Sequence, residues 1–186
     1  MVKIASVLFV VLLCAVPLMA QDDYPRIQTS LGYANLNLVD FGSVDPFSGF
    51  LTGATSHHSG FANETSFNFT RSLGVNNYMG IYGLGGNTTM IADFIGGRAM
   101  YRAARVVPYG LAGIGFGYLT SSSSYYGSSS FATRYGGGVD VPISDTMAWK
   151  FEVSRMSFHF GQLTPTSGSW ASGTNFQTGI VFTLAQ

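Results

Sequence analysis

The chain has 186 residues, of which 10% are charged, 46% hydrophobic and 15% aromatic, and its nine basic and nine acidic residues leave a formal net charge of zero. Because disorder needs high charge and few aromatic residues, this composition excludes a disordered chain, and the neutral balance excludes the basic footprint of a nucleic-acid-binding protein. The length fits one domain, and charge well below the roughly 25% of an average soluble domain predicts that part of the surface does not face water.

The first 20 residues have the layout of a secretory signal peptide. Lys3 supplies a basic start, an apolar run follows over 4–16, and Ala20 precedes the polar Gln21. The apolar run is shorter than the roughly 20 residues that a membrane-spanning helix needs. We therefore expect cleavage between Ala20 and Gln21, which leaves one exported domain over 21–186.

The rest of the chain alternates between apolar and polar residues with the period of two that is typical of β-strands. No later stretch has the roughly 18 uninterrupted apolar residues of a membrane-spanning helix. The alternation predicts about eight strands, at 26–38, 60–70, 75–84, 90–101, 106–118, 131–141, 147–158 and 174–184.

Two of these strands break the pattern. In the fourth, Asp93 and Arg98 have opposite parity, so one of them would lie on the apolar face unless the glycines between them form a β-bulge. In the fifth, Tyr109 and Leu111 are out of step with Ile114. We expect a phase slip among the glycines of that strand.

The connections between the predicted strands have two lengths. They are tight after the second, fourth and sixth strands, and long or rich in turn residues after the first, fifth and seventh, at 39–59, 120–130 and 161–173. Short turns at one end and long loops at the other are typical of outer-membrane barrels with periplasmic termini. The sequence therefore predicts an all-β fold, a closed, antiparallel, up-and-down transmembrane β-barrel with both termini in the periplasm.

The two faces of the predicted strands differ in chemistry. A lipid-facing outer surface explains the aromatic and aliphatic face, which in the terminal strand comprises Phe176, Ile180, Phe182 and Leu184. A Lys or Arg on that surface would cost roughly 2–4 kcal/mol at the membrane midplane. Charged residues of the polar faces are therefore expected in the lumen, namely Glu64, Arg134, Asp140, Lys150 and Glu152.

An unpaired ion in a narrow barrel interior is expensive, whereas a hydrogen-bonded ion pair is tolerated. We therefore expect these five lumenal residues to form a cross-lumen ion-pair network that plugs the barrel. The alternative is that they lie near wet barrel ends and interact only with water, where exposed ion pairs contribute little.

Three parts of the chain follow a known family pattern. They are 129–145 (SSFATRYGGGVDVPISD), 60–74, and 93–102 together with 107–110. They resemble the strands and short turns of small eight-stranded outer-membrane proteins, the OmpA transmembrane-domain and OmpX-like barrels. The resemblance implies an integral protein of a Gram-negative-type outer membrane that contacts outer-membrane lipid, is inserted by the barrel-assembly machinery and displays loops at the cell surface.

Candidate catalytic and metal-binding residues are few. Ser157 and His159 share a face, as in barrel lipases, but Glu152 has the other parity and no acid completes a triad. His57 and His58 are expected on an exposed loop without a second cluster of metal ligands. We expect no catalytic residue, no metal and no cofactor.

The main hypothesis is a non-enzymatic barrel with a structural or surface-interaction role, since eight strands enclose an interior that side chains fill. Its loops, rich in Ser, Tyr and Gly, would meet an extracellular ligand that the sequence does not identify. Two alternatives stay open, a lumenal lipid hydrolase or deacylase of the outer membrane, and a secreted soluble barrel that binds an apolar ligand.

Overall fold

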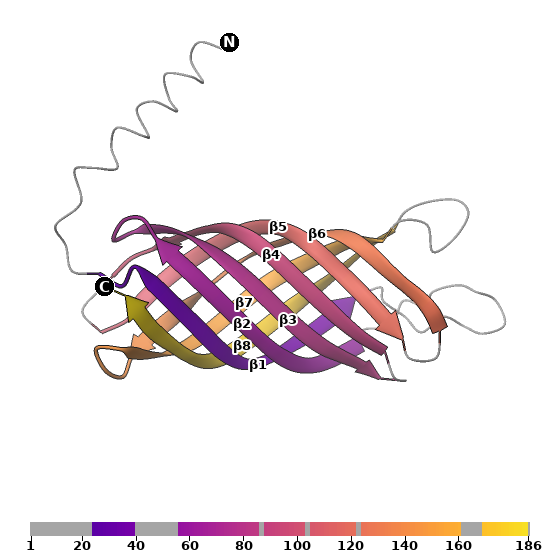
Figure 1. The fold of residues 1–186 in the computed structure, drawn as a ribbon, viewed down its shortest axis with the longest axis horizontal. Coiled ribbons are helices and arrows are strands. Elements are labelled where there is room, and N and C mark those ends of the chain that lie inside the picture. The colour runs from indigo at the N-terminus through magenta and orange to yellow at the C-terminus, as the bar shows by residue number, and fades with distance from the viewer. Residues whose placement is uncertain are drawn as a thin grey trace, which may run out of the picture.

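The computed structural model describes residues 24–39, 56–85, 88–102, 105–121, 124–160 and 169–185. Within these ranges every strand pairs antiparallel with the next and the last pairs with the first, so the sheet closes into a barrel (Figure 1). The strands are β1 (Ile27–Val39), β2 (Ser56–Asn68), β3 (Leu73–Gly85), β4 (Thr88–Met100), β5 (Val107–Ser121), β6 (Ser124–Pro142), β7 (Met147–Phe160) and β8 (Ser169–Ala185). The predicted closed, antiparallel, eight-stranded barrel is confirmed.

The two ends of the barrel are distinct. The start of β1 and the end of β8 lie side by side, where Ile27 pairs with Ala185 (Figure 1). The short connections after β2, β4 and β6 lie at the same end, which we call the terminal end, and the opposite end is called the loop end. No helix in the described ranges is long and apolar enough to cross a membrane.

The strands are strongly tilted. Followed from strand to strand, the ladder that starts at Thr29 returns to β1 at Val39, ten residues closer to the loop end. Between these two residues it passes through Thr65, Asn77, Ile95, Ile114, Thr133, Ser157 and Ser172. Each step to the next strand therefore rises by about one and a quarter residues, and a stagger of this kind accompanies the closure of a sheet into a barrel.

The outer wall is apolar. Phe61, Phe116 and Leu31 are 71%, 66% and 60% exposed, whereas the inward neighbours of such residues are buried. In β8 the predicted lipid-facing residues point outward, and Val181 between Ile180 and Phe182 is buried. This surface is the reverse of a soluble barrel, which exposes polar residues to water.

Of the two alternatives for β4, a bulge or a charge on the apolar face, the structure shows the second. The ladder between β4 and β5 runs without a shift from Thr88 to Met100. Arg98 is consequently buried in the lumen and Asp93 is exposed on the outer wall. The two charges therefore do have opposite parity, and the Asp93 carboxylate lies on the outer wall.

The predicted phase slip in β5 is wrong, because the strand keeps one register with β4 throughout. Tyr109 and Leu111 point inward, and the glycines that follow at the same parity continue the inward face, while Ile114 points outward. The pairing of β5 with β4 is continuous through this region. The apparent slip arose because apolar residues occupy both the outer wall and parts of the lumen.

Three strands begin at least four residues earlier than predicted. The serine-rich 120–130 tract, predicted as a long loop, forms the end of β5 and the start of β6, where Leu119 pairs with Ser128. Likewise β2 begins at Ser56 and β8 at Ser169. Backbone pairing with a neighbouring strand outweighs the weak intrinsic β-propensity of serine. Much of the 39–59 and 161–173 connections lies outside the described residues.

Candidate functional site: an ion-pair network in the lumen

Six Asp, Glu, Lys or Arg side chains of the described strands are buried in the lumen. They are Glu64, Arg98, Arg134, Asp140, Lys150 and Glu152, each no more than 3% exposed. Three are acidic and three basic, so their formal charges cancel. Burial of this kind is tolerated only when every charge has a partner of opposite sign.

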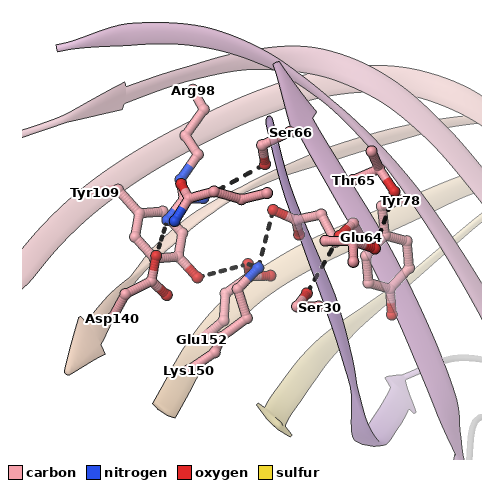
Figure 2. Close-up of polar contacts among 12 residues, drawn as sticks. Ser30, Glu64, Thr65, Ser66, Tyr78, Arg98, Tyr109, Asp140, Lys150 and Glu152 are labelled. Carbon is pink, nitrogen blue, oxygen red and sulfur yellow. Dashed lines mark hydrogen bonds and ion pairs between the residues drawn. The ribbon is translucent and has the colours of Figure 1, made fainter. Parts of the chain in front are cut away.

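Four of the six charges form one cluster. Arg134 on β6 reaches across the lumen to Glu64 on β2, with 3.1 Å between Nη2 and Oε2, and also forms an ion pair with Glu152 on the neighbouring β7. Lys150 Nζ lies 2.9 Å from Glu64 Oε1 and 3.8 Å from Glu152 Oε2. Figure 2 shows Lys150 and Glu64 approaching from different strands. Each carboxylate therefore bridges two cations.

The other two charges form a second pair closer to the terminal end. Arg98 on β4 forms an ion pair with Asp140 on β6, and its Nη1 lies 3.4 Å from Ser66 Oγ (Figure 2). Tyr109 joins the two groups, because its ring lies 3.7 Å from the Arg98 guanidinium while its hydroxyl donates a 3.0 Å hydrogen bond to Glu152. The six charges thus form one connected network.

Aromatic side chains cover the network on its loop-end side. The Arg134 guanidinium stacks 3.8 Å from the centre of the Tyr78 ring. Tyr78 is hydrogen-bonded to Tyr82, whose hydroxyl donates to Asn175 Oδ1 at 2.9 Å. Gly80 makes room for these rings, because a Cβ there would come within 2.9 Å of both tyrosine hydroxyls.

An apolar cluster occupies the lumen beyond this aromatic layer. Along β4 from the loop end, the inward residues Met90, Ala92 and Phe94 precede Arg98, and all three are at most 2% exposed. Leu36, Leu38, Ala132, Met156 and Phe158 belong to the same cluster. The network therefore lies between an apolar layer and the terminal end of the barrel.

The structure brings all five predicted lumenal residues into the lumen. Glu64, Arg134, Lys150 and Glu152 meet in one cluster, whereas Asp140, although opposite Lys150 in the ladder, pairs with Arg98. Sequence reasoning left Arg98 unplaced and missed the tyrosines. The sequence carried no signal that placed Arg98, because each face of β4 has apolar residues and one charge.

The remaining predicted sites have other surroundings. Ser157 Oγ lies 3.0 Å from Ser172 Oγ, and the His159 ring packs edge-on against Trp170. His57 and His58 belong to β2 rather than to a loop, and only His58 points inward. The described ranges contain no group of three His, Cys, Asp or Glu residues suited to a metal. The predicted cleavage site, Ala20 and Gln21, lies outside the described residues.

A closed barrel with an apolar outer wall and a paired, charged lumen is the architecture of an integral outer-membrane β-barrel protein. The family described as "Outer membrane protein beta-barrel domain" matches residues 6–183. The chain belongs to this family and is a protein of the outer membrane. Of the two sequence-based alternatives, the secreted soluble barrel is inconsistent with this family membership.

Solved structures share the fold at low sequence identity. Neisserial surface protein A has a TM-score of 0.65 and 11% identity over 85% of this chain and 97% of its own. Ail of Yersinia pestis has a TM-score of 0.50 and 16% identity, with coverages of 84% and 96%. AlkL, solved in lipid bilayers, has a TM-score of 0.52 and 12% identity, with coverages of 89% and 94%. Comparison with curated proteins finds no significant match.

Proposed function

We propose that this protein is a non-enzymatic outer-membrane barrel with a structural or surface-interaction role, and that its own side chains close the lumen to solutes. The carrying observation is the six-charge network, which spans the lumen from β2 to β6 and β7 with every charge within an ion pair. The apolar layer beyond it adds a second obstacle, because apolar side chains there cannot replace the hydrogen bonds that water and ions lose on entry.

Similar solved structures support the proposed surface role. The names of two similar structures, a Neisserial surface protein and an attachment invasion locus protein, refer to the cell surface and to attachment. A barrel without a permeation path is a scaffold, and its remaining accessible parts are the loops. We therefore assign interaction with an extracellular ligand to the loop end and insertion into lipid to the outer wall.

Solute uptake by proteoliposomes tests the closed lumen. Liposomes containing the wild-type protein are expected to swell in arabinose no faster than protein-free liposomes, because the paired charges block the lumen. A general porin reconstituted at the same protein-to-lipid ratio serves as the positive control. Swelling at the rate of that porin would contradict the proposal.

The proposed orientation places the terminal end in the periplasm, as an even strand number and short turns favour. Arg102 and Arg105 flank the turn between β4 and β5 at this end. Trypsin added to intact cells is therefore expected to leave this turn uncut, whereas permeabilised cells allow access to Arg105, which is exposed. Cleavage beside either arginine in intact cells would show that the orientation is inverted.

A further inference from the structure

Two charged residues of the described strands point away from the lumen. Asp93 on β4 and Arg155 on β7 are both exposed on the outer wall, and they carry opposite charges. Neighbours on the same wall, such as Ile95 and Val153, are exposed apolar residues. A charge on this surface of an outer-membrane barrel is costly unless it has a partner.

Neither charge has a counter-charge among the described residues of its own copy. Asp93 Oδ1 accepts a hydrogen bond of 2.9 Å from the Asn77 amide, which carries no charge. The Arg155 side chain has no hydrogen bond or ion pair within the described part of the chain. Within these residues, each side chain therefore leaves a full charge without a counter-charge on the outer wall.

The two charges lie at the same height in the membrane. The ladder from Asp93 leads through Phe116 and Phe131 to His159 on β7. Because the ladder rises by about one and a quarter residues at each strand, three steps raise it by about four residues. The residue of β7 level with Asp93 is therefore four positions nearer the terminal end than His159, which is Arg155.

The two residues cannot meet within one barrel. They are three strand positions apart, which is about 14 Å across the strands alone at the usual strand spacing, and they point in different directions around the wall. Two copies in one membrane share the same depth, so Asp93 of one copy is level with Arg155 of another. The contact would be head-to-tail, since the two patches differ.

A groove beside Asp93 offers space for a long side chain. It has a volume of about 340 Å³ and is lined by Asn77, Asp93, Ile95, Ile114, Gly115, Phe116 and Phe131. We infer that copies of this protein associate laterally in the membrane through an ion pair between Asp93 of one copy and Arg155 of the next, with the arginine side chain in this groove. The occupant is a second copy, because its charge and its height both match.

Cross-linking of mixed copies tests this contact. Ile95→Cys and Val153→Cys place thiols two residues from each charge, on the same outer face and at matching heights. In phosphatidylcholine vesicles, a short bismaleimide is expected to join I95C copies to V153C copies, while each variant alone gives no dimer. The only native cysteine is Cys14, in the predicted signal peptide, so wild-type protein is the reagent control.

Charge variants then test the ion pair itself. Asp93→Arg in the I95C copy is expected to abolish the cross-linked dimer, and Arg155→Asp in the V153C copy is expected to restore it. A heat-dependent gel shift shows which variants fold. If Asp93→Arg does not fold, Asp93→Asn is used in its place.

Four outcomes would overturn the inference. These are the absence of a dimer in the mixture, dimers formed equally well by one variant alone, cross-linking that is unaffected by Asp93→Arg or Asp93→Asn, and a dimer that requires added lipopolysaccharide. The last result would assign Arg155 to a lipid headgroup.

Discussion

Replacing Arg134 with methionine is expected to destabilise the folded barrel by about 3–5 kcal/mol, because removing one partner leaves a buried charge uncompensated. Arg134 contacts two carboxylates, those of Glu64 and Glu152, and its side chain is 1% exposed. Its loss leaves Lys150 as the one cation beside both. Urea unfolding in lipid vesicles, followed by tryptophan fluorescence, measures the change.

Two variants control this experiment. Arg105→Met makes the same replacement at an exposed turn position, where changes usually stay within about 0.5 kcal/mol. The double variant Arg134→Met, Glu152→Gln restores a neutral lumen and keeps the pair between Glu64 and Lys150, so it should recover part of the lost stability. Equal unfolding midpoints for Arg134→Met and Arg105→Met would contradict a buried, paired network.

A lysine at position 176 is expected to destabilise the barrel by about 2–4 kcal/mol, the cost of a cation on the lipid face near the midplane. Phe176 points outward and pairs with Asn35 and Val153 near the middle of their strands. Leu184→Lys is the matched control, because Leu184 lies on the same face near the terminal end, where the cost falls to about 0–1 kcal/mol. Unfolding in bilayers measures both.

The comparison also separates lipid exposure from mere surface exposure. If both lysine variants unfold at the wild-type urea concentration, the face that bears Phe176 does not meet hydrocarbon. If Leu184→Lys is the more destabilised of the two, the membrane is centred nearer the terminal end than the strand pairing indicates.

Much of the fold could be predicted from alternation alone. In β6 and in the first half of β7 the apolar and polar faces are well separated, so Arg134, Lys150 and Glu152 were assigned to the inward face. Adjacent strands joined by a short turn are neighbours in a barrel, which brought these residues together. The contact of Arg134 with Glu64 needed the closed barrel as well, because β2 and β6 are not neighbours.

Alternation failed where a face did not have its expected chemistry. The lumen is apolar near the loop end, so Leu36 and Phe158 point inward although their side chains suit lipid. Conversely, Asp93 lies on the outer wall, where its hydrogen bond with Asn77 partly offsets the cost. Strand parity is a property of the backbone, and side-chain chemistry reports it only when each face is uniform.

The partner of Asp140 shows a second limit. Asp140 lies opposite Lys150 in the ladder, yet its ion pair is with Arg98, two strands away in β4. Pairs across a lumen depend on barrel tilt and on side-chain length, and neither follows from the spacing of residues along the chain. Arg98 could be placed only once the continuous register of β4 was known.

The conductance of the wild-type barrel in a planar lipid bilayer tests the closed lumen most directly. A plugged barrel is expected to give no large, steady conductance, and Glu64→Ala and Lys150→Ala are expected to raise the current by breaking the ion pair between them. A large and steady wild-type conductance, unchanged in both variants, would show that ions pass through the barrel without meeting the network and would contradict the plugged lumen.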